Sequence, residues 1–229
     1  MGRRNEMIKT YNDLIQGSDE WHKARCGLLT ASEMKLIITP SKLSPAKNDK
    51  VKVHAYELAA QRATGYTEPS YIGDDILRGW DDEGKAKTKY TEYYAPITDV
   101  GFITNDKWGF TIGYSPDGLV YEDGLVECKS RRQKFQMETI VNNSIPDEHI
   151  IQCQTALLVS EREWLDYISY CGGMPMCVIR VTPDRKMQDA IIEAAKVFED
   201  SVQGLLHKYN EAIVGMIETE RTIEEEMVV

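Results

Sequence analysis

The chain has 229 residues, and 42% of them are hydrophobic, which is enough to fill the core of one compact domain. Its formal net charge of −10 argues against indiscriminate binding of nucleic acid, because such binding depends on lysine and arginine displacing counterions from phosphates. The five cysteines form no Cys-x-x-Cys pair and have no histidine cluster beside them, which disfavours a zinc site. We expect free thiols in a reducing cytoplasm.

The sequence has no run of about 20 apolar residues and no apolar leader at its N-terminus. We therefore expect a cytoplasmic protein with no membrane partner. Residues 1–229 are predicted to form a single domain whose acidic end, residues 219–229, is frayed. Four basic residues between positions 129 and 134 still allow a locally basic groove on this acidic body.

The first predicted element is a short helix. Thr30 and Glu33 have the spacing of a capping box, which predicts a helix that begins at Ala31 and ends before Pro40. Residues 41–50 then have the composition of a polar loop.

Helical and strand patterns alternate along the rest of the chain. Apolar spacing predicts helices over residues 52–64, 76–94, 148–160 and 185–217. Short β-rich runs predict strands over residues 101–104, 109–114, 119–121, 125–128, 164–171 and 176–181. Asp123-Gly124 predicts a tight hairpin turn between the third and fourth of these strands. This order indicates an α/β domain in which helices flank a central mixed β-sheet.

The most informative segment is Ser-Pro-Asp-Gly at positions 115–118, followed by Glu127, Cys128 and Lys129. Hydrolysis of a phosphodiester requires an activated water and relief of negative charge, and Mg²⁺ supplies both. Because Mg²⁺ takes oxygen ligands, we predict that the carboxylates of Asp117 and Glu127 and the backbone carbonyl of Cys128 bind it. Strand alternation puts Glu127 and Lys129 on one face. Lys129 then acts either as a general base or as an electrostatic stabiliser.

The hairpin raises a difficulty for this site. A strict two-residue turn at Asp123-Gly124 would pair Val120 with Glu127 and direct Asp117 to the opposite face of the sheet. We therefore expect a bend or bulge beside Asp117. The alternative is that Asp-Gly is an ordinary turn and that Glu-x-Lys is an ion pair on a solvated strand edge.

Further polar side chains on the flanking helices are candidates for the same site. Glu83 is the predicted third metal ligand, although Asp81 and Asp82 are adjacent alternatives and a surface role is the simpler reading. Downstream, Gln152 can hydrogen-bond a phosphate or a metal-bound water, whereas Gln154 is expected to be a half-buried structural residue.

These motifs carry a family resemblance. Residues 21–33 read WHKARCGLLTASE and resemble the W-H-x-x-R-x-G-x-x-T-A-S-E signature of lambda exonuclease and related YqaJ-type viral recombinases, a family of alkaline exonucleases. The family's G-x-x-x-E, S-P-D-G, E-x-K and helical Q-x-Q motifs follow in order, at residues 79–83, 115–118, 127–129 and 152–154. The resemblance implies a PD-(D/E)xK nuclease with a restriction-endonuclease-like core. Beyond Ser160 only the order of elements is similar.

The resemblance also implies roles for individual residues. Two Mg²⁺ ions, for which Mn²⁺ can substitute, would be held by Asp117, Glu127, the Cys128 carbonyl and Glu83, with Lys129 and Gln152 completing the catalytic set. The terminal 5′-phosphate would be bound by Arg25, Ser32 and Ser115, and chemistry agrees because arginine presents a planar fork to phosphate. Trp21, Arg131 and Arg132 are added as DNA contacts. The plainer alternatives are a surface ion pair for Arg25, a helix-start preference for Ser32 and a core role for Trp21.

The activity implied is a Mg²⁺-dependent 5′→3′ exonuclease that degrades one strand of linear double-stranded DNA from 5′-phosphorylated ends. The implied setting is phage-type recombination in a bacterial cytoplasm, with a homotrimeric ring and a single-strand annealing protein as partner. Two alternatives are a structure-specific or restriction-type endonuclease and a catalytically idle DNA-binding or partner-docking module. The intact Asp117, Glu127 and Lys129 weigh against the idle module.

Overall fold

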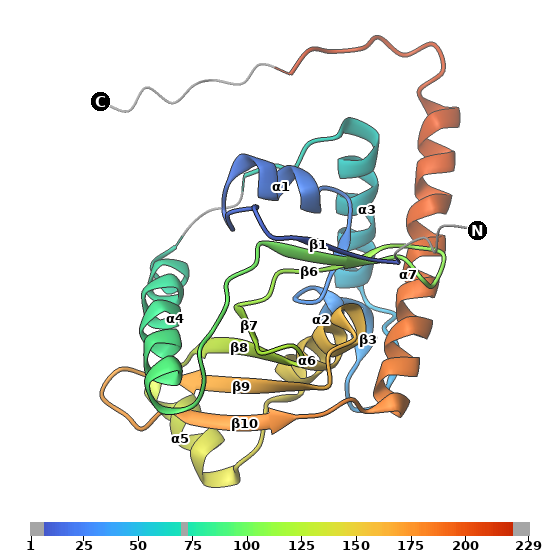
Figure 1. The fold of residues 1–229 in the computed structure, drawn as a ribbon. Coiled ribbons are helices and arrows are strands. Elements are labelled where there is room, and N and C mark those ends of the chain that lie inside the picture. The colour runs from blue at the N-terminus through green and yellow to red at the C-terminus, as the bar shows by residue number, and fades with distance from the viewer. Residues whose placement is uncertain (1–6, 70–72, 222–229) are drawn as a thin grey trace, which may run out of the picture.

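Two four-stranded mixed sheets form the centre of the protein, and helices flank them (Figure 1). The computed structural model describes residues 7–69 and 73–221. This arrangement confirms the predicted α/β class with mixed sheets between helices. Among the described residues, no helix combines the length and the apolar character needed to cross a membrane.

The first sheet has the strand order β1-β5-β6-β2, in which only β2 and β6 run parallel. Its strands are β1 (Ile8–Tyr11), β2 (Leu29–Thr30), β5 (Phe102–Asn105) and β6 (Ile112–Tyr114). The second sheet has the order β10-β9-β8-β7, in which only β8 and β9 run parallel. Its strands are β7 (Gly118–Val120), β8 (Gly124–Ser130), β9 (Trp164–Tyr170) and β10 (Cys177–Val181). A small ribbon pairs β3 (Ile38–Thr39) with β4 (Ser44–Pro45).

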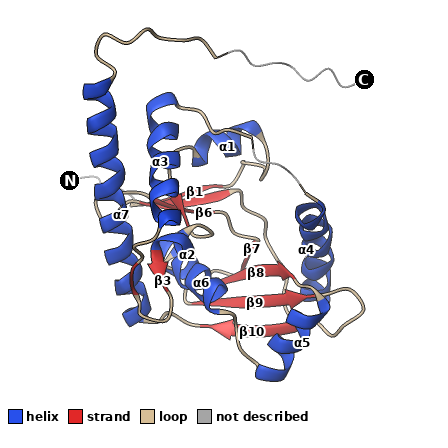
Figure 2. Ribbon diagram, turned by 180° about the vertical axis from the view of Figure 1, so that it is seen from behind, coloured by secondary structure: helices blue, strands red, loops and turns tan. Residues whose placement is uncertain are grey.

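Seven helices complete the described part of the chain, and Figure 2 shows them against the strands. They are α1 (Asp19–Arg25), α2 (Met34–Ile37), α3 (Asp49–Thr64), α4 (Asp74–Tyr93), α5 (Gln133–Asn142), α6 (Asp147–Ser160) and α7 (Arg185–Ala212). The predicted long helices are confirmed, although the last ends at Ala212 and not near 217. The predictions missed α1 and α5 and the four N-terminal strands β1, β2, β3 and β4.

The alternation of side chains along β8 divides the second sheet between two cores. Leu125 packs into the large core to which α6 and α7 contribute, whereas Val126 and Cys128 pack with Ala86 and Tyr90 of α4. Helices α6 and α4 therefore cover opposite faces of β8. Residues on β8 can in this way meet side chains from two helices that are far apart in the sequence.

The hairpin between β7 and β8 differs from the prediction. Val120 pairs with Gly124, and Gly118 pairs with Val126, so the loop has the three residues 121–123 and Tyr121 adopts a left-handed φ of 49°. Gly124 is the first residue of β8. The position requires glycine, because a Cβ there would lie 2.2 Å from the indole of Trp164. One step beyond Gly118, this register puts Asp117 opposite Glu127. Asp117 itself lies at a bend that directly precedes β7, so the expected bend is confirmed and no bulge is needed.

The predicted helix at Ala31 was also wrong in its start. Thr30 pairs with Gly113 in the first sheet, and the helical segment begins only at Met34. Glu33 does reach back, as in a capping box, and its carboxylate accepts hydrogen bonds from the backbone N–H and the hydroxyl of Thr30. The polar loop 41–50 contains β4 and ends at Asn48, which caps α3. Most of the predicted frayed tail, residues 222–229, lies outside the described residues. The single-domain assignment stays a prediction.

Candidate active site

The segment Ser115 to Asp117 connects the two sheets. Strand β6 of the first sheet ends at Tyr114, and β7 of the second sheet begins at Gly118. The side-chain amide of Gln16 donates to the carbonyl of Pro116 at 2.7 Å and holds this connection in place. The sequence analysis did not single out Gln16. Side chains from the two sheets can therefore come together at this loop.

Glu127 is the most constrained acid in the second sheet, with only 1% of its surface exposed. One carboxylate oxygen accepts from Lys129 Nζ at 2.6 Å and from Gln152 Nε2 at 2.5 Å, and the other accepts from Tyr114 OH at 3.2 Å. These donors come from β8, α6 and β6. The structure thus brings together three predicted residues, Glu127, Lys129 and Gln152. Tyr114 was missed.

Asp117 lies beside this group. Its Oδ2 accepts a hydrogen bond from the backbone N–H of Cys128 at 2.6 Å, which fixes the carboxylate against β8. Burial, followed by repulsion from Glu127 and Glu83, raises the pKa of Asp117 well above its ordinary value. Buried carboxylates that repel one another are stabilised by a proton or by a bound cation.

The predicted third acid, Glu83, lies on α4 beside Asp81 and Asp82. Asp81 pairs with Lys85 on the exposed side of α4, and Asp82 accepts from the hydroxyl of Ser130 at 2.6 Å. Burial raises the pKa of Glu83, and Glu127 adds to the rise, whereas Lys87 opposes it. Lys87 also pairs with Asp99 at 2.6 Å. The negative charge of Glu127 therefore acts on Glu83.

Lys129 carries the positive charge nearest to these acids. Burial disfavours its ammonium, but attraction to Glu127 and Asp117 outweighs burial, so the pKa of Lys129 lies above its ordinary value. The Nζ atom is held by Glu127 at 2.6 Å. The side chain is consequently a cation fixed in position beside the carboxylates.

The donor set suits a hard divalent cation. In the described part of the chain, no three Asp, Glu, His or Cys side chains converge closely enough to enclose a metal by themselves, so Glu83 does not close a cage with Asp117 and Glu127. Mg²⁺ needs no such cage, because it keeps several waters and takes one or two protein carboxylates. Burial and the repulsion from Glu127 and Glu83 raise the pKa of Asp117, and a bound cation would stabilise its negative charge against both. The residues therefore fit Mg²⁺.

A second polar group lies at the other end of the connecting loop. Ser115 Oγ accepts from Arg25 Nη1 at 2.7 Å and from Trp21 Nε1 at 3.1 Å. The guanidinium of Arg25 lies 4.3 Å from the Trp21 ring centroid, in cation–π contact. Burial lowers the pKa of Arg25, although Glu33 opposes the shift. Arg25, Ser115 and Trp21 therefore form a donor group that suits an anion.

Ser32 is not part of this contact. Its side chain is exposed, and its hydroxyl lies 3.2 Å from Thr30 Oγ1. The expected first helical turn is absent at this position, because α2 begins at Met34 with Glu33 as its N-cap. Ser32 therefore lies before the helix, and its exposed hydroxyl is the group that a ligand could contact.

The remaining predicted residues lie farther along the chain. Arg132 pairs with both carboxylate oxygens of Asp75, at 3.0 and 2.9 Å, and Arg131 lies 5.1 Å from the Phe135 ring centroid. Gln154 donates to the carbonyl of Thr182 and accepts from a backbone N–H, which confirms its structural role. All five cysteines are free thiols, as expected.

Comparison with known proteins shows which family contains this chain. The profile of the YqaJ-like viral recombinase domain matches residues 20–163. The chain belongs to the YqaJ-like viral recombinase family. The match spans both halves of the site, from Trp21 to Gln152. No curated protein sequence matched the chain.

Solved structures agree with this assignment. An alkaline exonuclease (LHK-Exo) from Laribacter hongkongensis is 27% identical, with a TM-score of 0.77 over 87% of this chain and 100% of that one. The same exonuclease in complex with dAMP is 28% identical, with a TM-score of 0.71 over 85% and 100% of the two chains. A phage related exonuclease from Haemophilus somnus 129PT shares the fold at 12% identity, with a TM-score of 0.59 over 80% and 96%.

Proposed function

We propose that the protein is a Mg²⁺-dependent 5′→3′ exonuclease that degrades one strand of linear double-stranded DNA from 5′-phosphorylated ends. Family membership and the likeness to an alkaline exonuclease support a nuclease. The finer assignment rests on one observation. Ser115, in the anion-suited group, and Asp117, in the cation-suited group, are two residues apart on one loop. A terminal phosphate held at Ser115 therefore lies next to the carboxylates.

The catalytic group works through charge and position. Mg²⁺, for which Mn²⁺ can substitute, would be held by Asp117, Glu127 and the Cys128 carbonyl, with Glu83 reaching it through water, and would supply Lewis acidity and an activated water. Glu127 keeps one orientation because three donors hold its two oxygens. Lys129, whose Nζ lies 2.6 Å from Glu127, can stabilise the phosphate electrostatically in the transition state or act as the general base.

The donor group at Ser115 sets the direction of digestion. The guanidinium of Arg25 presents a planar fork of donors to a phosphate. Its hydrogen bond to Ser115 and its stacking on Trp21 fix the orientation of that fork. When the 5′-terminal phosphate is held there, the next phosphodiester along the strand is the one presented to Asp117 and Glu127. Each cut then exposes a new 5′-phosphate. Ser32, with its exposed hydroxyl, is the remaining candidate contact.

The proposed biological setting is supported by membership of a viral recombinase family. We place the protein in phage-type homologous recombination, as a phage or prophage product in the bacterial cytoplasm, beside a single-strand annealing protein. A homotrimeric ring around the duplex would explain how a chain with a net charge of −10 stays on DNA, since enclosure needs less electrostatic attraction.

The experiment compares two DNA forms. The protein is incubated with Mg²⁺ and either linear duplex with 5′-phosphates or covalently closed circles of the same sequence, and products are followed over time. The proposal requires mononucleotides from the linear DNA and intact circles. Cutting of the circles would instead show an endonuclease, and inertness toward both forms in Mg²⁺ and Mn²⁺ would favour an idle binding module.

A further inference from the structure

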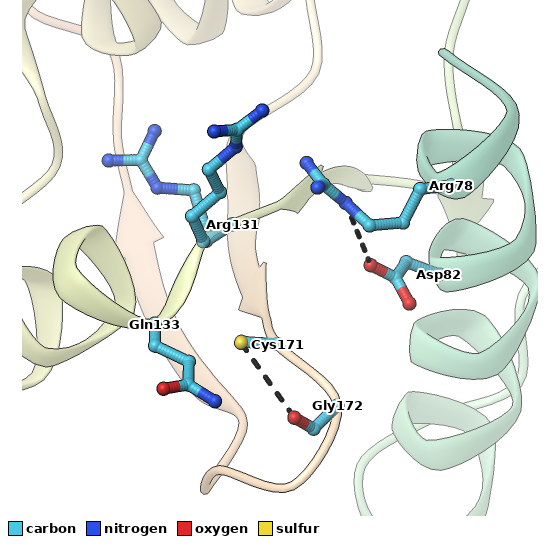
Figure 3. Close-up of a pocket in the computed structure, with 7 residues that line it drawn as sticks. Arg78, Asp82, Arg131, Gln133, Cys171 and Gly172 are labelled. Carbon is cyan, nitrogen blue, oxygen red and sulfur yellow. Dashed lines mark hydrogen bonds and ion pairs between the residues drawn. The ribbon is translucent and has the colours of Figure 1, made fainter. Parts of the chain in front are cut away.

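An open pocket of about 390 Å³ lies at the end of β8, between α4 and the start of α5 (Figure 3). Its walls include three arginines, Arg78, Arg131 and Arg132, and one acid, Asp82. Arg78 reaches from α4 toward the segment that carries Arg131. The pocket is separate from the Arg25–Ser115 group and adjoins the catalytic strand. Its lining is therefore positively charged on a protein that is acidic overall.

The three arginines differ in whether their N–H groups have hydrogen-bond partners. Arg132 is bound by both oxygens of Asp75, and Arg78 pairs with Asp75 at 3.1 Å and donates to Ser130 Oγ at 3.2 Å. Arg131 is different, because its Nε is buried and has no hydrogen-bond partner among the described residues. Arg131 is partly exposed and lines the pocket, so its guanidinium has donor capacity that a ligand there could use.

The start of α5 adds to the same attraction for an anion. This ten-residue helix has Arg132 at its N-cap, no side-chain hydrogen bond to cap it, and no acid in its first turn. Its first residue, Gln133, lines the pocket. Free N–H groups at a helix N-terminus carry partial positive charge and favour phosphate. The helix terminus and the arginine donor thus point to one chemistry.

The pocket is also well placed relative to the carboxylates. The backbone N–H of Arg131 donates to the carbonyl of Tyr170 at 2.7 Å, so the pairing of β8 with β9 continues past Ser130. Arg131 is then two residues beyond Lys129, a distance of roughly 6.6 Å along an extended strand. A phosphate bound there would be close enough to Glu127 to belong to the same DNA molecule.

We propose that this pocket binds a backbone phosphate of the duplex, held by Arg131 and the α5 N-terminus with Arg78 opposite. It is a second phosphate contact, distinct from the one proposed for the terminal 5′-phosphate. The inference rests on the proposed function in taking duplex DNA as the substrate. It concerns binding only, so it can fail while the exonuclease assignment stands.

The test measures binding of a 5′-phosphorylated linear duplex by proteins that all carry Asp117→Asn, which stops hydrolysis. Adding Arg131→Ala should weaken binding roughly tenfold to a hundredfold, the range of a charge-assisted hydrogen bond. The slope of log affinity against log salt should fall by about one. Arg185→Ala removes an exposed arginine at the start of α7 and is the charge-matched control, expected to change binding less than about twofold.

A second measurement needs no change to the pocket. Single neutral methylphosphonates are placed at successive positions of each strand, and one internal position should weaken binding strongly in the Asp117→Asn protein. The same DNA should weaken the Arg131→Ala protein no further, because the contact is already lost. Equal losses at every position, or an additive loss with Arg131→Ala, would overturn the proposal. Digestion of linear duplex by the unmodified protein, measured separately, tests the exonuclease assignment itself.

Discussion

The two sheets carry buried charged groups of opposite sign, and burial makes each charge unfavourable. Near the first sheet, Arg25 is a cation whose pKa is lowered by burial and whose closest partner is the hydroxyl of Ser115. At the second sheet, Asp117 is a carboxylate whose pKa is raised by burial and by Glu127. The first group is stabilised by an anion and the second by a cation. Under the proposed function, a DNA end with its terminal phosphate and a metal ion would supply both, across the loop that joins the sheets.

The largest expected effect comes from removing the charge on the second sheet. Asp117→Ala and Glu127→Ala should each lower hydrolysis of linear duplex by at least roughly a thousandfold, because a lost metal ligand removes Lewis acidity and the activated water together. Initial rates in Mg²⁺ and circular dichroism, to confirm folding, check this. Asp81→Ala removes an exposed acid paired with Lys85 and is the matched control, expected to retain near-normal activity. Near-normal turnover in either site variant would contradict the comparison.

A smaller effect is expected from Lys129. Lys129→Ala should lower kcat about a hundredfold to a thousandfold and change DNA affinity much less, since its charge matters most where negative charge develops. Lys129→Arg keeps the charge but cannot serve as a base, because arginine does not deprotonate in proteins. Recovery of kcat by Lys129→Arg supports the electrostatic role. A loss of affinity with unchanged kcat in Lys129→Ala would make the residue a groove contact.

The smallest effect concerns stability. Because the folded state raises the pKa of Asp117, its ionisation weakens the metal-free fold, and stability falls as pH rises from about 4 through the raised pKa. Asp117→Asn should remove this loss and raise Tm near neutral pH, by about 2–4 °C for each kcal/mol recovered. Asp200→Asn, at an exposed position on α7, is the control that should leave Tm unchanged. A lower Tm for Asp117→Asn without metal would contradict the electrostatic account.

Local chemistry in the sequence predicted Glu127, Lys129 and Gln152, which the structure gathers at the second sheet, but it did not predict Tyr114. Alternation along an extended strand fixes that Glu127 and Lys129 share a face, and helical spacing delivers Gln152 to them. The position of Asp117 needed the hairpin register, which depends on a three-residue loop and on the packing of Gly124 against Trp164. That packing is tertiary and leaves no local signal.

The helix starts show which local signals in the sequence could be read and which could not. Ser18, which accepts from Trp21 N–H, and the acids Asp19 and Glu20 form a readable start for α1 that the predictions overlooked. By contrast, α5 begins at Arg132 with no capping side chain and offers no such signal. Ser32 was misplaced because Thr30 pairs in the sheet, and strand pairing overrode a local helix signal.

The end-group preference of digestion tests the joining of the two groups most directly. Initial rates are measured for the unmodified protein and for Arg25→Ala, each on otherwise identical linear duplexes with 5′-phosphate or 5′-hydroxyl ends. The unmodified protein should digest phosphorylated ends roughly tenfold to a hundredfold faster, the value of about 1.5 to 3 kcal/mol for a charge-assisted hydrogen bond, and Arg25→Ala should lose most of that preference. An unmodified protein that ignores the end group, or an Arg25→Ala variant that keeps the full preference, would contradict the account.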